Sequence, residues 1–294
     1  MTTSYAARRF DTLLEFVKMQ GCGNDYLFLN CLNVPPPAQL PALARSMSDR
    51  HFGAGADGLV LVLPARGNGA DCRMQMFNSD GSEAEMCGNA IRCVAKLVYE
   101  RGEIVREKIN VETLAGLMKL ELTIEEGRVP SVRVDMGQPC FSPQKIGVRL
   151  EGERIIGQPL EVEGRRFEMT CVSMGNPHAV IFLEEPVEDF QVSRYGPIIE
   201  HLPIFINRTN VEFVNVRGEN LLRQRTWERG AGETLACGTG ASAVAVASIS
   251  TGRCCPGKVD ILLNGGALAI EWRDGESVFM TGPAEEVYTG RWPD

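Results

Sequence analysis

NSDGSEAEMCGNA, residues 78–90, and ERGAGETLACGTG, residues 228–240, are two versions of one sequence pattern. When the two are aligned on Cys87 and Cys237, a glycine follows each cysteine and a glutamate precedes each by four residues. A largely apolar stretch without turn residues comes next in both versions, which predicts a helix after each cysteine. Each half of the chain therefore carries one thiol at the start of a helix.

The duplication extends beyond the cysteine segments. MQGCGNDYLFL, residues 19–29, resembles MGNPHAVIFL, residues 174–183, because in each a Gly-Asn pair precedes an apolar run that is typical of a strand. The interval from this asparagine to the cysteine is 63 residues in the first copy (24 to 87) and 61 in the second (176 to 237). Two landmarks at nearly equal intervals indicate two copies of one α/β unit.

Short runs bounded by glycine, asparagine or proline predict the strands of each copy. These runs lie at 59–63, 73–77, 108–112, 172–174, 180–183, 212–216 and 262–270. The helices expected at about 88–100 and 238–250 are apolar over most of their circumference, which is typical of burial. We therefore expect an α/β fold of the α+β kind, with two pseudo-symmetric domains that each wrap a mostly antiparallel sheet or barrel around a central buried helix. The expected domains are 14–130, completed by the tail 283–294, and 131–282.

Charge and hydropathy exclude several classes of partner. The net charge is −8 and the lysines and arginines form no run, so nucleic acid is not an expected partner. No apolar run approaches the ~20 residues that span a bilayer. Residues 1–10 contain no apolar segment typical of a signal peptide. We therefore expect a cytoplasmic protein that binds no membrane.

Ten cysteines could indicate disulfides, a metal site or small buried residues. A disulfide framework is typical of short secreted chains, which this chain does not resemble. No two cysteines have the C-x-x-C spacing and the chain has three histidines, so we expect no metal site. Most of the cysteines are expected to be small buried apolar residues, and only Cys87 and Cys237 have a setting that indicates chemistry.

A thiol at a helix start has a well-defined chemical use. The helix dipole and the unpaired N–H groups lower a thiol pKa from about 8.5 into roughly the 3.5–7.5 range at favourable sites. The same N–H groups bind a carboxylate. Two facing helix starts would thus place an acid and a base on opposite sides of one carbon, which favours a racemase or epimerase. Desolvation opposes the dipole, so the sequence does not predict which thiol is ionised.

Several further motifs accompany the two cysteine segments. They are GND at 23–25, GAGADG at 53–58, GNPH at 175–178 and TNV at 209–211. Together with the cysteine segments they closely resemble the diaminopimelate epimerase family, from about Phe16 to Trp292. The resemblance implies a cofactor-independent enzyme that interconverts LL- and meso-diaminopimelate for lysine and peptidoglycan synthesis. A homodimer is also plausible from the family.

The resemblance also implies roles for individual residues. Cys87 and Cys237 would be the acid and base, with roles that exchange according to the direction of reaction, and His178 and Glu228 would tune the two thiols. Donors to the reacting carboxylate would come from Gly88, Asn89, Gly238 and Thr239. The remaining substrate groups would be held by Asn24, Asn78, Asn176, Asn210, Glu228 and Arg229.

The chain departs from the family pattern at two positions. Some members have a substrate-contacting glutamine where this chain has Gly58, so we expect that contact to be missing or bridged by water. Ala90 stands where many members have glycine, and in the first turn of a helix its methyl group should be harmless. Glu83 and Glu233 are expected to order their loops by hydrogen bonds rather than to act in catalysis.

Two alternative functions stay open at this point. A proline or hydroxyproline racemase of the same fold would place its thiols similarly, but its small ring would not need Asn78, Asn210 and Arg229. A thiol-disulfide or metal-binding protein could also use the two cysteines. The repeat is symmetric at the thiols and asymmetric where Asn78 matches Glu228, which favours a long substrate held at one end.

Overall fold

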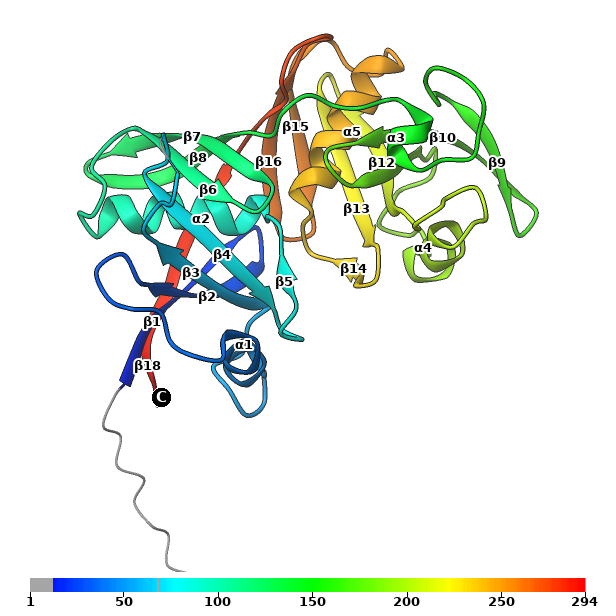
Figure 1. Cartoon of the computed structure of the whole chain (residues 1–294). Coiled ribbons are helices and arrows are strands. Elements are labelled where there is room, and N and C mark those ends of the chain that lie inside the picture. The colour runs from blue at the N-terminus through cyan, green and yellow to red at the C-terminus, as the bar shows by residue number, and fades with distance from the viewer. Residues whose placement is uncertain (1–12, 68, 294) are drawn as a thin grey trace, which may run out of the picture.

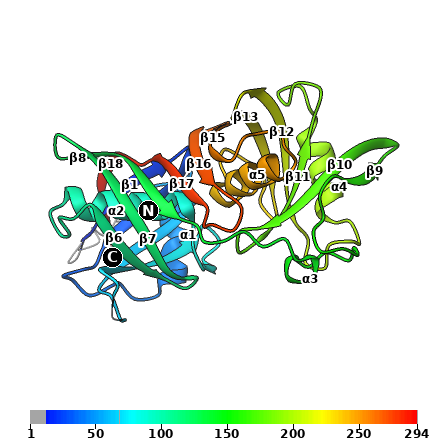
Figure 2. The ribbon, with the colours of Figure 1, turned by 90° about the horizontal axis from the view of Figure 1, so that it is seen from above.

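The structure, a computed structural model, describes residues 13–67 and 69–293, which form two halves lying side by side (Figures 1 and 2). The first ten residues, on which the signal-peptide expectation rests, lie outside the described part. Among the described helices none is long and apolar enough to cross a membrane.

The first half contains ten elements, of which α2 is the long helix after the first cysteine. They are β1 (Leu13–Gly21), β2 (Asn24–Asn30), α1 (Leu40–Ser48), β3 (Gly58–Leu63), β4 (Cys72–Asn78), β5 (Glu83–Ala84), α2 (Gly88–Glu100), β6 (Lys108–Thr113), β7 (Gly116–Glu125) and β8 (Arg128–Asp135).

The second half begins with two additional elements, a short helix and a strand, then repeats this order, and α5 is its counterpart of α2. Its elements are α3 (Pro143–Ile146), β9 (Gln158–Val162), β10 (Arg165–Ser173), β11 (Pro177–Phe182), α4 (Val192–Glu200), β12 (Asn210–Gly218), β13 (Leu221–Glu228), β14 (Gly232–Thr234), α5 (Gly238–Ser250), β15 (Gly257–Leu263), β16 (Gly266–Trp272) and β17 (Phe279–Pro283), and β18 (Glu285–Pro293) ends the described chain.

Strand pairing repeats between the halves. In the first half β1–β2 and β3–β4 are antiparallel, β2–β3 and β4–β6 are parallel, and β6, β7 and β8 form an antiparallel meander. The second half pairs β10–β11, β12–β13, β11–β12, β13–β15 and β15–β16–β17 in the same senses. This confirms the predicted fold of two pseudo-symmetric, mostly antiparallel sheets.

Two strand contacts join the halves. β8 pairs with β7 in its own half and with β17 in the other, so the sheet continues from one half into the next. β18 then returns to the first half and pairs with β1 from Leu13 to Gln20, nearly the whole of that strand (Figure 1). The expected boundary at 130–131 falls inside β8, and the division into 14–130 with 283–294 and 131–282 stays a proposal.

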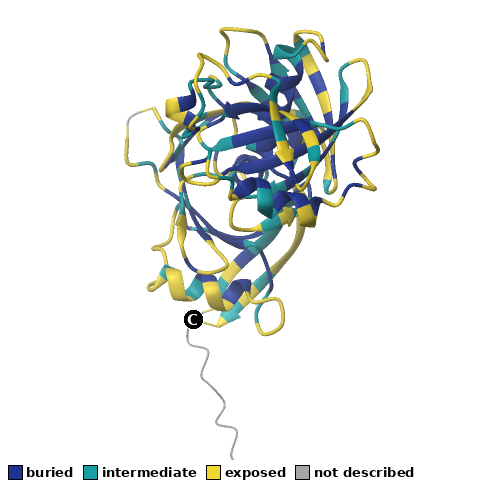
Figure 3. Cartoon of the chain, turned by 90° about the vertical axis from the view of Figure 1, so that its right-hand side faces the viewer, coloured by how far each residue is buried: buried dark blue, intermediate teal, exposed yellow. Residues whose placement is uncertain are grey.

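The two central helices match their predicted bounds, 88–100 and 238–250. Each is packed inside its sheet, and both belong to one apolar core that runs through the two halves. Figure 3 shows buried residues gathered in the interior and exposed residues in the loops. α5 is built largely from glycine, alanine, serine and valine, which lets the surrounding strands approach it closely.

The strand predicted over 262–270 is wrong, because the chain turns in its middle. Leu263 pairs with Gly266, so Asn264 and Gly265 form the two-residue loop of a hairpin between β15 and β16. Asn-Gly is a strong signal for such a loop, since both residues tolerate the backbone conformations of a tight hairpin turn. The apolar residues on both sides of the turn gave the appearance of one continuous run.

The close packing of α5 predicts a penalty for added volume. Ala245→Leu should lower the free energy of unfolding by about 1–3 kcal/mol, because Ala245 is fully buried inside its sheet. Ala267→Leu, the same change at an exposed position of β16, is the matched control and should alter stability by less than about 0.5 kcal/mol. Urea unfolding measures both variants, and equal midpoints would contradict this view of α5.

Candidate active site

The two cysteines occupy equivalent positions at the starts of α2 and α5. Cys87 and Cys237 are N-cap residues with extended backbone conformations (φ −135° and −126°). Sγ of Cys237 accepts a hydrogen bond from the Gly240 N–H at 3.3 Å. Sγ of Cys87 accepts one from the Tyr26 hydroxyl at 3.6 Å, and its thiol donates to Oδ1 of Asn24 at 3.4 Å. Both sulfurs thus lie at the positive end of a helix dipole.

The two helix starts approach each other across one methionine of β17. A Cβ on Gly88 would lie 2.9 Å from Cε of Met280. A Cβ on Gly238 would lie 3.0 Å from Sδ of Met280 and 3.9 Å from Cα of Gly88. Glycine at both positions leaves room for this methionine, whereas a larger residue would have to displace the end of its side chain. The glycine that follows each cysteine therefore brings the two helix starts to one place.

A cavity of about 320 Å³ lies between the halves and has both thiols in its wall. Most of the predicted site residues line it, namely Asn24, Asn78, Cys87, Gly88, Asn89, Asn176, Glu228, Cys237, Gly238 and Thr239. The cavity is also lined by residues that no sequence motif indicated, among them Tyr26, Met76, Ala115 and Met174. Gly58 begins β3 and is not part of the wall.

Two of the residues predicted to hold substrate, Asn210 and Arg229, are not among those that line the cavity. Asn210 is buried, and its Nδ2 donates to the Pro177 carbonyl at 2.8 Å. Oδ1 of Asn210 accepts the backbone N–H of Arg229 at 2.9 Å. The exposed guanidinium of Arg229 donates to the carbonyl of Asn207 at 3.1 Å, so it is engaged outside the cavity.

The third predicted residue that does not line the cavity is His178, which belongs to a buried polar network. Its Nδ1 lies 2.8 Å from Oε1 of Glu212, and both side chains are 0% exposed. Its Nε2 lies 3.0 Å from Oδ1 of Asn176, which lines the cavity. His178 therefore contacts the cavity wall only through the Asn176 side chain, and its other ring nitrogen contacts the Glu212 carboxylate.

Glu212, which the sequence analysis did not select, is the centre of this network. Its Oε2 accepts hydrogen bonds from Nε2 of Gln224 at 2.7 Å and Oγ1 of Thr226 at 2.6 Å. A Cβ on Gly240 would lie only 2.6 Å from Oε1 of Glu212, so the carboxylate packs against the first turn of α5. The same Gly240 donates its N–H to the Cys237 sulfur. A fully hydrogen-bonded carboxylate is thus fixed beneath one of the two thiols.

Burial decides the direction of the thiol pKa shifts. Burial raises the pKa of Cys87, although the N–H groups of Ala90 and Asn89 and the Tyr26 hydroxyl oppose this. Burial also raises the pKa of Cys237 well above its usual value, and the charges of Glu228 and Glu212 add to the effect. Of the two opposed effects that the sequence left undecided, desolvation therefore outweighs the helix dipole at both sulfurs.

Burial likewise raises the pKa of the Glu228 carboxyl, which lines the cavity. The hydroxyl of Thr234 donates to its Oε1 at 2.6 Å and opposes the rise, whereas the nearby charge of Glu212 reinforces it. Two carboxyl groups therefore face the second thiol, one in the wall and one beneath α5.

A buried arginine supports the first helix start. Arg92 is 0% exposed, and its guanidinium donates to the Gly88 carbonyl and to Oδ1 of Asn89, both at 3.0 Å. Nδ2 of Asn89 in turn donates to Oδ1 of Asn24 at 3.2 Å. Nε of Arg92 donates to the Pro283 carbonyl at 3.0 Å, which ties α2 to the end of β17. The sequence pattern predicted only an apolar helix here and did not indicate the role of Arg92.

The two glutamates that precede the cysteines order the adjacent short strands, as expected. Oε1 of Glu83 accepts a hydrogen bond from Nε2 of Gln75 at 2.7 Å, between β5 and β4. Glu233 accepts two from the Arg225 guanidinium, at 2.7 and 2.9 Å, between β14 and β13. The first turn of α2 also accommodates the methyl group of Ala90, which is fully buried.

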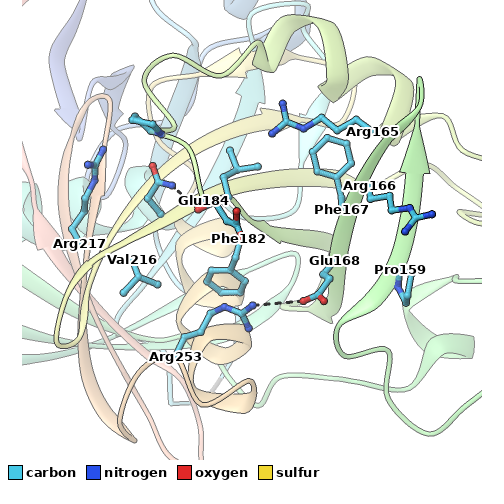
Figure 4. A pocket seen from close by; sticks show the side chains of 13 residues that line it. Pro159, Arg165, Arg166, Phe167, Glu168, Phe182, Glu184, Val216, Arg217 and Arg253 are labelled. Carbon is cyan, nitrogen blue, oxygen red and sulfur yellow. Dashed lines mark hydrogen bonds and ion pairs between the residues drawn. The ribbon is translucent and has the colours of Figure 1, made fainter.

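A larger cavity, of about 790 Å³, lies in the second half between β10, β11 and β12 (Figure 4). Its described lining includes none of the predicted site residues. Several of its charged groups pair with carboxylates, for example Arg253 with Glu168 at 3.8 Å and Arg217 with Glu188. It has no thiol in its described wall and offers no counterpart to the two helix starts.

The chain is similar in sequence to proteins of one known family. A family model described as diaminopimelate epimerase matches residues 16–142 and 170–287. The chain is 51% identical over 280 residues to a diaminopimelate epimerase of Acetivibrio thermocellus, covering 94% of this chain and 98% of the relative. It is also 51% identical over 285 residues to one of Pelotomaculum thermopropionicum, covering 95% and 99%.

A solved structure of a hydroxyproline epimerase from Agrobacterium vitis is similar in fold, with a TM-score of 0.69 and 18% identity over 96% of this chain and 93% of that one. At this identity the likeness concerns the fold alone, whereas the sequence relatives extend over nearly the full length of both chains. The chain therefore belongs to the diaminopimelate epimerase family.

Proposed function

We propose that the chain interconverts LL- and meso-diaminopimelate without a cofactor, by proton transfer at Cα between Cys87 and Cys237. One observation carries this proposal: both thiols cap helices whose starts meet in the wall of one cavity. A carbon atom bound between them would have a sulfur on each face, as inversion requires. Membership of the diaminopimelate epimerase family supports the choice of substrate.

Inversion breaks one bond and forms one. A thiolate takes the proton from Cα, and the electron pair of the C–H bond moves toward the α-carboxylate. The other thiol donates its proton to the opposite face of the same carbon. Unpaired N–H groups at the starts of α2 and α5 stabilise the charge that develops on the carboxylate. Each turnover exchanges the protonation of the two sulfurs, so the reverse reaction uses the same pair.

The polar side chains of the cavity wall suit the remaining groups of a two-headed amino acid. Asn24, Asn78 and Asn176 can donate and accept hydrogen bonds without adding charge. Arg229 is suited to a bidentate grip on a distal carboxylate, which requires its side chain to leave the Asn207 carbonyl. We expect this movement to accompany closure of the two halves, which excludes water from the reacting carbon.

A racemase of proline-like substrates is the second candidate. The fold likeness to a hydroxyproline epimerase supports it, since that fold holds a related pair of halves. A small ring substrate, however, offers no second amino acid head for Asn78 or Arg229. The homodimer is a further proposal, which the family resemblance supports, and the cytoplasmic location stays an expectation from the sequence.

A substrate panel tests the proposed reaction. The purified chain, without added cofactor, should convert LL-diaminopimelate to an equilibrium mixture with the meso form and leave L-proline and hydroxyproline unchanged. The measurement is chiral chromatography of the products. Turnover of proline with none of diaminopimelate would select the second candidate.

Single-thiol variants test the two-base mechanism. Cys87→Ala and Cys237→Ala should each lower the rate of inversion by about 10²–10⁴-fold, because one face of Cα loses its proton donor or acceptor. In deuterated water the remaining thiol can still exchange the Cα proton that faces it, so label should enter only one stereoisomer. Cys255→Ala, at an exposed cysteine, is the matched control and should keep full activity. Undiminished inversion in either single-thiol variant would rule out the mechanism.

A matched pair of substitutions tests the carboxylate beneath α5. Gly240→Ala should lower kcat/KM by on the order of 10-fold or more, since the added Cβ displaces Glu212 and misplaces the first turn that carries Cys237. Ala90→Gly makes the reverse change at the equivalent position of α2 and should leave kcat/KM within about threefold, because it removes one methyl group and strains nothing. Equal losses in the two variants would show that the carboxylate contact has no special importance.

A further inference from the structure

The duplication places unlike residues at equivalent positions around the two thiols. Tyr26 and His178 each follow their Gly-Asn pair by two residues. They also pair with equivalent residues of the next parallel strand, Tyr26 with Gly58 and His178 with Asn210. Tyr26 is therefore the counterpart of His178 in the first half.

The two halves also differ at the next pair of equivalent strand positions. Two residues beyond these pairs, Val60 of the first half corresponds to Glu212 of the second. The strand neighbours of these residues are Met76 and Thr226. The layer beneath Cys87 is thus apolar where the layer beneath Cys237 holds a carboxylate with its hydrogen-bond donors.

Two groups near Cys87 favour a negative charge on its sulfur, whereas Oδ1 of Asn24 accepts from its neutral thiol at 3.4 Å. The Tyr26 hydroxyl donates to this sulfur at 3.6 Å. The guanidinium of Arg92, one turn further along α2, has no carboxylate among its described hydrogen-bond partners. A hydroxyl donor and an uncompensated positive charge both stabilise a thiolate.

The surroundings of Cys237 favour a neutral thiol. Glu212 packs against the first turn of α5, and Glu228 lies in the cavity wall. Two carboxylates near one sulfur oppose its ionisation by charge repulsion. The Gly240 N–H and the Thr239 hydroxyl lie within hydrogen-bond distance of this sulfur, but neither carries a charge.

We propose that Cys87 holds the thiolate and Cys237 the thiol in the enzyme without substrate, and that Tyr26 is the positioning residue that stabilises the Cys87 thiolate. This assignment rests on the proposed function, because it concerns the two sulfurs that act on Cα. It also gives the enzyme a preferred starting form, in which one face of the site is basic and the other acidic.

The titratable and charged groups around the two sulfurs come from several elements. Those facing Cys87 are Tyr26 of β2, Arg92 and Cys93 of α2 and Glu228 at the end of β13. Those facing Cys237 are Glu228 and, from β12, Glu212, which is paired with His178 of β11.

The causes of the pKa shifts agree with the assignment. Burial raises the pKa of both thiols; at Cys237 the charges of Glu228 and Glu212 add to this rise, whereas at Cys87 the N–H groups of Ala90 and Asn89 and the Tyr26 hydroxyl oppose it, with Glu228 as the one carboxylate that adds to it. Burial also raises the pKa of Tyr26 well above its usual range. Its hydroxyl therefore keeps the proton that it donates while the thiol titrates.

Alkylation of the two cysteines as a function of pH tests the assignment on the wild-type chain. The protein is treated briefly with iodoacetamide between about pH 6 and 11, and modification of the peptides with Cys87 and Cys237 is followed by mass spectrometry. The accessibility of a thiol changes its alkylation rate by the same factor at every pH. The midpoint, the pH at which alkylation is half-maximal, therefore reports the ionisation of that thiol. We expect the Cys87 midpoint at lower pH. A lower midpoint for Cys237, or equal midpoints, would overturn the proposal.

Tyr26→Phe tests the positioning role. Loss of the hydroxyl should raise the Cys87 midpoint by about one pH unit and leave the Cys237 midpoint in place, because only the Cys87 thiolate loses a donor. The acidic limb of the kcat/KM profile should move upward with it, which lowers kcat/KM roughly tenfold below the midpoint. An unmoved Cys87 midpoint, or an equal shift of both, would overturn the role of Tyr26.

Two controls separate this proposal from folding effects and from the proposed function. Tyr99→Phe, near the far end of α2, makes the same substitution away from the cavity and should move neither midpoint. Thermal unfolding identifies a Tyr26→Phe chain that fails to fold, and the wild-type order of midpoints then still decides the assignment. Alkylation needs no turnover, so an inactive chain with Cys87 ionising first would refute the epimerase function and leave the assignment standing.

Discussion

The close approach of two helix starts across Met280 is the constraint on which the rest of the site depends. Because Gly88 and Gly238 lack side chains, the methionine fits between the helices and the capping cysteines lie in one cavity. The β8–β17 pair holds the two sheets in one continuous system, so the helices inside them keep this relation. Duplication of the fold supplies two helix starts that each carry a cysteine. Strand pairing between the two copies holds these helix starts in the wall of one cavity.

The sequence predicted the features that follow from local pattern. The bounds of α2 and α5 and the duplication were visible because capping cysteines, glycines and apolar runs recur at equal intervals. The hairpin at Asn264-Gly265 was missed because the apolar residues before and after this Asn-Gly turn were assigned to a single strand. Glu212 was missed for another reason. Side chains alternate between the two faces of a strand, and an acidic side chain is normally expected on the face toward solvent. Here the pairing of β11 with β12 buries Glu212 beside His178. Such partners are set by tertiary structure.

The direction of the thiol pKa shifts lay beyond the sequence for a similar physical reason. A helix start can be recognised from Cys87-Gly88 or Cys237-Gly238, and its dipole favours ionisation over a short range. Burial depends on every element that closes over the sulfur, including β17 and the loop that carries Ala115. Desolvation acts on the full charge of a thiolate, whereas the helix dipole supplies only a partial charge. The cost of desolvation therefore outweighs the stabilisation by the dipole.

A raised thiol pKa is compatible with proton abstraction from carbon. The Cα proton of an amino acid is far less acidic than a thiol, so a base whose pKa is raised by burial gains driving force for the transfer. The cost is a smaller fraction of ionised thiol, which the Tyr26 hydroxyl and the N–H groups of the first turn reduce at Cys87. At Cys237 the neighbouring carboxylates instead preserve the proton that must be delivered. The same buried cavity thus strengthens the base on one face and protects the acid on the other, and the residues that differ between the two copies of the fold decide which face is which.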